Sequence, residues 1–220
     1  MGNQMFCFQC EQTAGCKACT GASGVCGKKA DTAELQDQLT GALIGLARSI
    51  EGNEELVTSE THKLVLEALF TTITNVNFNN ETIATLIDRV KAEKERLVPR
   101  CFGCSSACGR NDDYDMQRLW NADEDIRSLK SLILFGIRGV AAYAYHAAVL
   151  GYTDESINNF FFKALFAIGM DDWGMDELLP IVLEVGEVNL KCMALLDKAN
   201  TETYGNPVPI EVSITVEKGP

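Results

Sequence analysis

Apolar residues recur every three to four positions through most of the chain, the period of an amphipathic α-helix. Asn, Gly and Pro residues interrupt this pattern and separate the stripes into helices. The first three stripes carry leucine, isoleucine and valine without chemically active side chains, so they are expected to form core. The pattern predicts helices at about residues 31–52, 58–79, 81–99, 123–150, 153–169 and 176–200.

Two helix starts have a sequence signal of their own. Asp31 is followed three residues later by Glu34, the spacing of a capping box, so Asp31 is predicted as an N-cap. Thr153 is predicted to cap the fifth helix, which follows Gly151.

The fourth predicted helix is apolar enough to raise a membrane-spanning alternative, because residues 131–150 hold few polar side chains. Arg138 lies in the middle of this stretch, and a charge at mid-bilayer costs roughly 3 kcal/mol on insertion scales. A helix buried in a soluble bundle is therefore favoured. Gly136 and Gly139 are expected to let neighbouring helices approach closely.

The tail changes character, since Ile210, Val212, Ile214 and Val216 alternate with polar residues as in a half-buried strand. A lone strand leaves its own backbone unpaired. The predicted fold class is all-α, a helical bundle with a short C-terminal β segment. The expected organisation is a Cys-rich loop over residues 1–30, a helical domain over 31–206 and an extended tail over 207–220.

The amino-acid composition limits the classes of binding partner that the chain is expected to have. The 220 residues carry 31 acidic and 19 basic side chains, a net charge of −12. Nucleic acid and an anionic membrane surface would be repelled. The charge favours solubility, and an acidic face for a positively charged redox partner is the second interpretation. The first residues lack the features of a signal peptide, so the cytoplasm is the expected location.

The strongest chemical signal is at the N-terminus, where two, eight and six residues separate Cys7, Cys10, Cys19 and Cys26. Four thiolates in one glycine-rich loop suit an iron–sulfur cluster, and Phe6 and Phe8 would shield it from water. A zinc site made of the same four cysteines and a disulfide framework are the alternatives.

A second thiol group, Cys101, Cys104 and Cys108, lies in a predicted loop and forms a possible second site. It has no fourth ligand nearby in sequence, so reduced structural thiols are the competing interpretation. Cys192 lies within a helical stripe and is expected to be a small buried hydrophobe. His62 and His146, the only histidines, are expected to serve packing or the surface.

The chain resembles the hybrid cluster proteins, also called hydroxylamine reductases. The resemblance rests on segments spread over nearly the whole chain: Met5–Ala14, Gly24–Lys28, Ala68–Asn75, Asp123–Lys130, Gly139–His146 and Ala194–Asn206. It is restricted to the N-terminal helical domain of that family. In the family two further domains hold the hybrid iron–sulfur–oxygen cluster, where hydroxylamine or nitric oxide is reduced. The tail is therefore expected to lead toward an absent following domain, in a fragment, a natural short form or an engineered piece.

The resemblance implies that Cys7, Cys10, Cys19 and Cys26 bind the cluster and that Cys16 does not, because Cys19 fits the family spacing. The gap of eight residues is similar to members with a [4Fe–4S] cluster. The gap of six residues is closer to members with a [2Fe–2S] cluster, so that alternative stays open.

Two functions remain. The first is an electron-transfer domain of a hydroxylamine reductase-type oxidoreductase, with a [4Fe–4S] cluster and no catalytic residue of its own. Its partners would be a redox donor protein or a small reductant, together with the missing catalytic domains or another chain, and it could be an oligomer. The second is a zinc-stapled helical interaction domain without a redox role.

Overall fold

The computed structural model describes residues 5–10, 17–73, 76–97 and 112–212. Within these residues only an isolated bridge between Cys7 and Cys19 has β pairing, so the predicted all-α class is confirmed. The described helices are α1 (Ala30–Ile50), the 3-10 helix η2 (Glu54–Leu56), α2 (Ser59–Thr71), α3 (Asn80–Leu97), α4 (Met116–Trp120), α5 (Glu124–Val149), α6 (Glu155–Gly169) and α7 (Met175–Tyr204).

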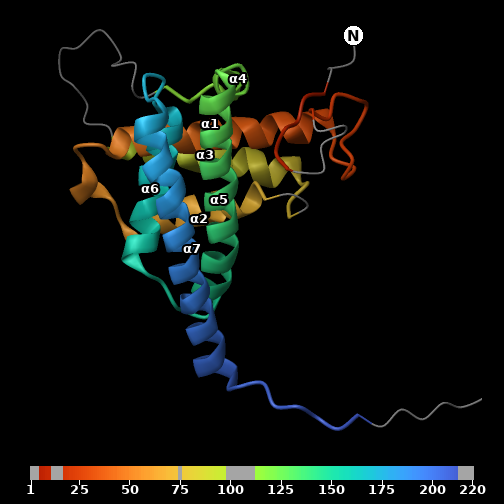
Figure 1. The fold of residues 1–220 in the computed structure, drawn as a ribbon, viewed down its shortest axis with the longest axis vertical. Helices are drawn as coiled ribbons and strands as arrows, with labels where there is room; N and C mark the ends of the chain where they lie inside the picture. Colours follow the sequence, from red (N-terminus) through yellow and green to blue (C-terminus); the bar gives the residue numbers. More distant parts are fainter. Residues whose placement is uncertain (1–4, 11–16, 74–75, 98–111, 213–220) are drawn as a thin grey trace, which may run out of the picture.

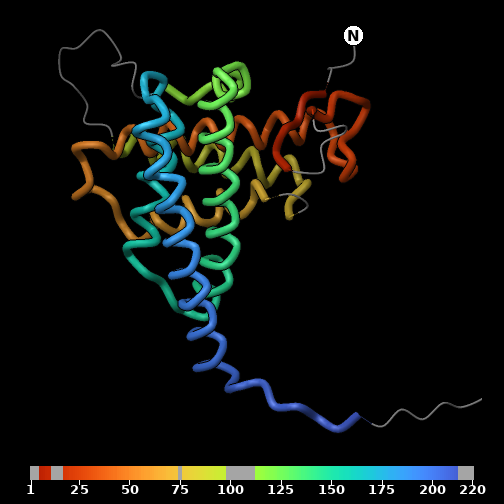
Figure 2. Tube along the Cα trace, in the orientation of Figure 1, coloured from red at the N-terminus to blue at the C-terminus, as the bar shows by residue number. Residues whose placement is uncertain are grey.

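The helices cross one another in two groups. Helices α1 and α3 run across the view of Figure 1, whereas α5, α6 and α7 run close to its long axis. Helix α1 packs against both α3 and α6, while α5 packs mainly against α7 and α2. The Cys-rich segment lies at the N-terminal end of α1, to one side of the bundle (Figure 2). Helix α1 therefore connects this segment to the core.

The α5–α7 contact depends on one of the two glycines that the sequence singled out. A Cβ atom on Gly136 would lie 2.4 Å from Cγ1 of Val185 in α7, so no larger residue fits without movement. A Cβ on Gly139 would meet nothing within 4 Å, and Gly139 is exposed. The expected close approach is thus made at Gly136 alone.

Arg138 of α5 is buried and joins the two helix groups. Its Nη2 donates to Oγ1 of Thr40 in α1 at 3.0 Å, and its Nε donates to Oγ1 of Thr72 at 3.1 Å. Among the described helices, only α5 is long and apolar enough to cross a membrane, with 44% of its most apolar window buried. Its contacts with α2, α6 and α7 and its buried arginine are those of a core helix.

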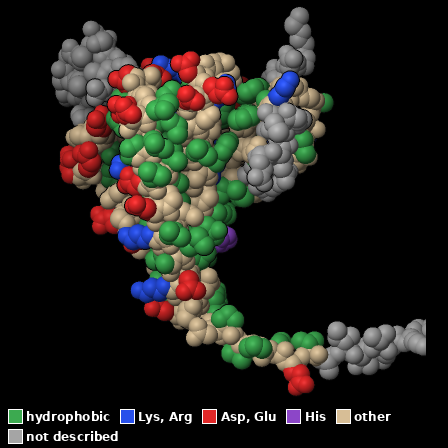
Figure 3. Space-filling model, viewed as in Figure 1, with side chains coloured by type: hydrophobic (Ala, Val, Ile, Leu, Met, Phe, Trp, Pro, Cys, Tyr) green, Lys and Arg blue, Asp and Glu red, His purple; other side chains and the backbone are tan. Residues whose placement is uncertain are grey.

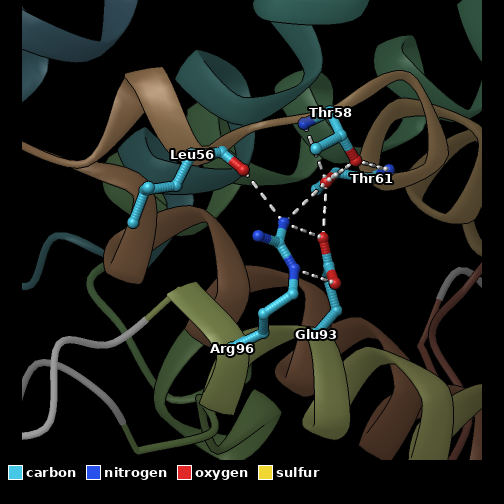
Figure 4. Close-up of polar contacts among 5 residues, drawn as sticks. All are labelled: Leu56, Thr58, Thr61, Glu93 and Arg96. Atoms are coloured by element: carbon cyan, nitrogen blue, oxygen red, sulfur yellow. Dashed lines mark hydrogen bonds and ion pairs between the residues drawn. The ribbon is translucent and has the colours of Figure 1, made fainter.

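The start of α2 is tied to the end of α3 by a polar network (Figure 4). Thr58 and Thr61 form a reciprocal capping box, which matches the predicted helix start. Arg96 donates to Oε1 of Glu93 at 2.7 Å and to the carbonyl oxygen of Leu56 at 2.9 Å. The Arg96 hydrogen bond is the main reason that the pKa of Glu93 is lowered.

Two predicted caps are wrong. Helix α1 begins at Ala30 with Lys29 as N-cap, so Asp31 lies in the first turn, where its carboxylate accepts from the backbone N–H of Thr32. The cap of α6 is Asp154, one residue after Thr153, and its carboxylate accepts from two backbone N–H groups. A carboxylate near a helix N-terminus is stabilised by the helix dipole even when it is not the cap.

Helix α7 and the tail leave apolar side chains in solvent. The last turns of α7 extend beyond the bundle, and apolar side chains gather over the α5–α7 face in Figure 3. The exposed apolar residues of this region are Leu179, Leu183, Leu190, Met193, Tyr204, Val208, Ile210 and Val212. The expected β segment forms no strand as far as Val212, where the described tail ends. A strand needs a neighbour to pair with its backbone.

Candidate metal centre

Cys7 and Cys19 are brought together by the backbone. The N–H of Cys7 donates to the carbonyl of Cys19 at 3.1 Å, and the N–H of Cys19 donates back at 2.9 Å. Both residues are buried, and they pack with Met5 and Ala33 in a small apolar cluster separate from the main core. Two of the four predicted ligands, distant in sequence, therefore lie side by side.

Cys26 lies in a tight turn that follows this pair. The N–H of Gly24 donates to the carbonyl of Lys28 at 2.8 Å, and Gly27 takes a φ of +84°, a conformation that glycine adopts without strain. A Cβ on Gly24 would lie 3.5 Å from Sγ of Cys26 and 3.3 Å from Cε of Met5. A side chain at position 24 would therefore crowd Met5 and contact the thiol of Cys26.

The five described cysteines, Cys7, Cys10, Cys19, Cys26 and Cys192, are all free thiols, so none of them supports a disulfide framework. No three His, Cys, Asp or Glu side chains of the described segments are placed to hold one metal ion. The structure brings Cys7 and Cys19 together but does not gather a third cysteine with them. Cys16 and the predicted second group, Cys101, Cys104 and Cys108, lie outside the described residues.

Aromatic side chains attach this segment to the bundle. The ring of Phe8 meets Trp120 of α4 edge-on, with centroids 5.5 Å apart, and Phe6 lies 6.5 Å from the same ring. Phe8 is half-buried and Phe6 is exposed at 37%. The predicted role of the two phenylalanines beside the cysteines is therefore supplemented by Trp120, which the periodicity did not reveal because α4 has only five residues.

A lysine is buried beneath the cysteines. Lys28 is 2% exposed, and its ammonium donates to Oε1 of Gln9 at 2.8 Å and to Oε1 of Gln36 at 2.5 Å. Both acceptors are neutral amides, and the ammonium forms no ion pair with any described carboxylate. Gln9 lies between Cys7 and Cys10, so the positive charge is held directly against the segment that carries them.

Asp37 and Arg138 extend the polar contacts of Gln9 toward the core. Nε2 of Gln9 donates to Oδ1 of Asp37 at 2.6 Å, and Asp37 is attracted by the buried guanidinium of Arg138. Burial raises the pKa of Asp37 to about 6, against the opposing effects of the Gln9 hydrogen bond and Arg138. The Nη1 group of Arg138 has no hydrogen-bond partner in the described part of the chain.

The protonation of Cys7 responds to the same groups. Burial raises the pKa of the Cys7 thiol, because the thiolate is the charged form, and the Lys28 ammonium opposes this rise. Metal binding requires the thiolate. A metal centre bound by four thiolates would bring negative charge to this region. Among the described residues, Lys28 has no carboxylate partner there, and Nη1 of Arg138 has no hydrogen-bond acceptor. The charges around Cys7 and Cys19 therefore suit a thiolate-bound centre, iron–sulfur or zinc, although no third described cysteine is gathered with this pair.

Sequence reasoning missed Lys28, Gln36 and Asp37 as parts of this site. Their signal was weak, because a lysine after a turn and polar residues at a helix start are ordinarily solvated. Arg138 was noticed only as an obstacle to membrane insertion, although a lone charge in an apolar helix indicates a buried partner.

The other described cysteine and histidine side chains named in the sequence analysis have packing contacts. Cys192 is buried as predicted, its Sγ lies 3.5 Å from the carbonyl oxygen of Val140, and burial raises its pKa to about 11. His62 borders a cavity of about 580 Å³ and packs on Phe162 with ring centroids 5.4 Å apart. Burial lowers its pKa. His146 meets Phe70 edge-on. The packing role predicted for both histidines agrees with these contacts.

The chain is similar to proteins named hydroxylamine reductase from bacteria and archaea. It is 41% identical to that of Porphyromonas gingivalis over 238 aligned residues, 40% to that of Clostridium novyi and 41% to that of Methanococcus vannielii. The alignments cover 97 to 100% of this chain but 42 to 43% of each relative, so the chain spans less than half of their length.

The family model described as Prismane/CO dehydrogenase family matches residues 5–220, from the cysteine segment to the tail. Proteins of this family carry iron–sulfur clusters, in agreement with the free thiols and the buried cations of the N-terminal segment. We conclude that the chain belongs to the Prismane/CO dehydrogenase family.

Proposed function

We propose that this chain is the electron-transfer part of a hydroxylamine reductase-type oxidoreductase, with one [4Fe–4S] cluster on Cys7, Cys10, Cys19 and Cys26. The observation that carries the proposal is the pairing of buried Cys7 and Cys19 near a buried lysine that has no carboxylate partner among the described residues. When bound, such a cluster supplies a place for a single electron. A [2Fe–2S] cluster is the alternative.

The residues around the proposed cluster would orient its ligands, exclude water and supply positive charge. The backbone pairing orients Cys7 and Cys19, and Phe8 and Trp120 exclude water from one side. Lys28 places positive charge where electrons would add negative charge. No general base or nucleophile is needed, and we assign no catalytic residue.

A cluster with all four iron positions bound by cysteine has no open metal position, so we propose that a nitrogen oxide does not react at this site. From this cluster the electron would pass to another metal centre. Hydroxylamine, the substrate in the name of the relatives, is the proposed final acceptor. The donor would be a redox protein or a small reductant.

The proposed setting is the cytoplasm, without nucleic-acid or membrane partners, as the net charge of −12 suggests. The exposed apolar residues of α7 and the tail support a further domain or another chain as a neighbour, since contiguous apolar surface usually marks an interface.

The experiment is anaerobic reconstitution of the chain, followed by iron, sulfide and zinc quantitation. Single replacement of Cys7, Cys10, Cys19 or Cys26 by serine should remove most of the iron, and Cys16→Ser is the matched control that should keep it. A colourless protein that binds zinc and no sulfide would instead support the zinc-stapled interaction domain. Iron loss on Cys16→Ser together with iron retention on Cys19→Ser would contradict the ligand assignment.

A further inference from the structure

Lys28 is 2% exposed, and its ammonium forms no ion pair with any described carboxylate. Lys130 is equally buried, but its ammonium donates to the carbonyl oxygen of Met170 at the end of α6 and not to the cysteine segment. Burying an ammonium costs several kcal/mol unless a partner compensates for the lost hydration. Gln9 and Gln36 offer dipoles but no charge. Their amides are held in turn, since Gln9 donates to Asp37 and Gln36 donates to the carbonyl oxygen of Asn77. The structure therefore fixes the lysine in place with its charge only partly compensated.

The described residues around Lys28 do not offer a better partner. The nearest carboxylate in this network is Asp37, which reaches the ammonium only through Gln9. Asp37 is also attracted by the guanidinium of Arg138, a second buried cation, whose Nη1 has no partner among the described residues. Two cations thus share one carboxylate beneath the cysteine segment.

We expect the metal-bound cysteines to supply the negative charge that compensates the Lys28 ammonium. Lys28 follows the turn that holds Cys26, and its ammonium binds the side chain between Cys7 and Cys10. Four metal-bound thiolates place a net negative charge in this low-dielectric region, where Coulomb attraction is strong.

We infer that Lys28 is the counter-charge of the thiolate-bound cluster and a positioning residue that raises its reduction potential. This inference rests on the proposed function, because it requires a redox-active metal group on Cys7, Cys10, Cys19 and Cys26. One electron from a donor protein or small reductant adds one negative charge to the cluster, the donor is oxidised by one electron, and no covalent bond forms or breaks. A fixed positive charge nearby stabilises the reduced form more than the oxidised form.

The test compares Lys28→Met with Lys29→Met in the anaerobically reconstituted full chain. Lys29 is the matched control because it is the adjacent lysine and is exposed. Iron and sulfide are quantified first, and the midpoint potential is then measured by a dithionite titration followed by absorbance and electron paramagnetic resonance. We expect a shift of the potential to more negative values in Lys28→Met and an unchanged potential in Lys29→Met, at equal iron content.

Each outcome has a defined meaning. A loaded Lys28→Met protein with the unaltered potential overturns the inference and leaves the proposed function standing. Unaltered chain that binds no iron overturns both. A folded Lys28→Met chain, checked by far-UV circular dichroism, that no longer binds iron supports the counter-charge role. Lys28→Gln is the second neutral variant, and failure of both variants to fold without metal would make the lysine purely structural and the inference wrong.

Discussion

Gly136→Ala should destabilise the bundle, although alanine is the better helix former. The new Cβ would lie 2.4 Å from Cγ1 of Val185, more than 1 Å inside ordinary van der Waals contact. Val185 is buried, and a β-branched side chain in a helix has one strongly preferred rotamer, so it cannot easily turn away. Overpacking of this kind costs roughly 1–3 kcal/mol. Helix propensity returns about 1 kcal/mol, which leaves a net loss of roughly 1 kcal/mol.

Gly139→Ala is the matched control in the same helix. Nothing lies within 4 Å of its new Cβ, so only the propensity gain of about 0.5–1 kcal/mol should remain, and the protein should become more stable. The two substitutions are chemically identical and three residues apart, yet their expected effects have opposite signs.

Urea unfolding of the metal-free reduced chain, followed by circular dichroism, measures both effects as shifts of the midpoint at constant slope. A second check is the double variant Gly136→Ala with Val185→Ala. It should be more stable than the sum of its single effects predicts, because the second truncation removes the clash. A stabilising Gly136→Ala, or strict additivity in the double variant, would refute the argument from close packing.

Three further outcomes are expected. Burial raises the pKa of Asp37 to about 6, so the metal-free chain should lose stability as pH rises from about 4 through 6, and Asp37→Asn should flatten this dependence in urea midpoints; an unchanged pH profile would refute the assignment. Cys192 should react with a thiol reagent only after unfolding, since it is buried and its pKa is raised to about 11; rapid native labelling would contradict its burial. The reconstituted chain alone should not oxidise reduced viologen when hydroxylamine is added, and robust turnover would argue against a purely electron-transferring site.

The long helices could be predicted because a 3.6-residue stripe of large apolar side chains has few alternatives in water. Helix α5 is the clearest case, since its predicted end near Leu150 agrees with the observed end at Val149. Helix α4 could not be predicted from periodicity, because five residues complete little more than one turn. The described part of the expected tail strand, as far as Val212, is not a strand, and the rest lies outside the described residues. A strand needs a pairing partner, which the alternation of side chains cannot supply.

The four candidate ligands could be proposed from the sequence, whereas their surroundings could not. The spacing of Cys7, Cys10, Cys19 and Cys26 is a local feature, and the pairing of Cys7 with Cys19 is a tertiary one. The buried ammonium of Lys28 depends on Gln36, which α1 brings to it, and no local pattern near a glycine turn indicates that a lysine will leave the solvent.

Gln36 implies an order of assembly. Its side-chain oxygen accepts from Lys28 of the cysteine segment, while its nitrogen donates to the carbonyl oxygen of Asn77, just before α3. One turn further along α1, Thr40 donates to the backbone oxygen of Gln36 and accepts from Arg138 of α5. The site of the lysine is therefore held through Gln36 by the residues before α3, and the same turn of α1 is held by α5 through Thr40. We expect the helices to fold first and to serve as the template on which the cysteine segment is laid, so that metal is inserted late during biogenesis.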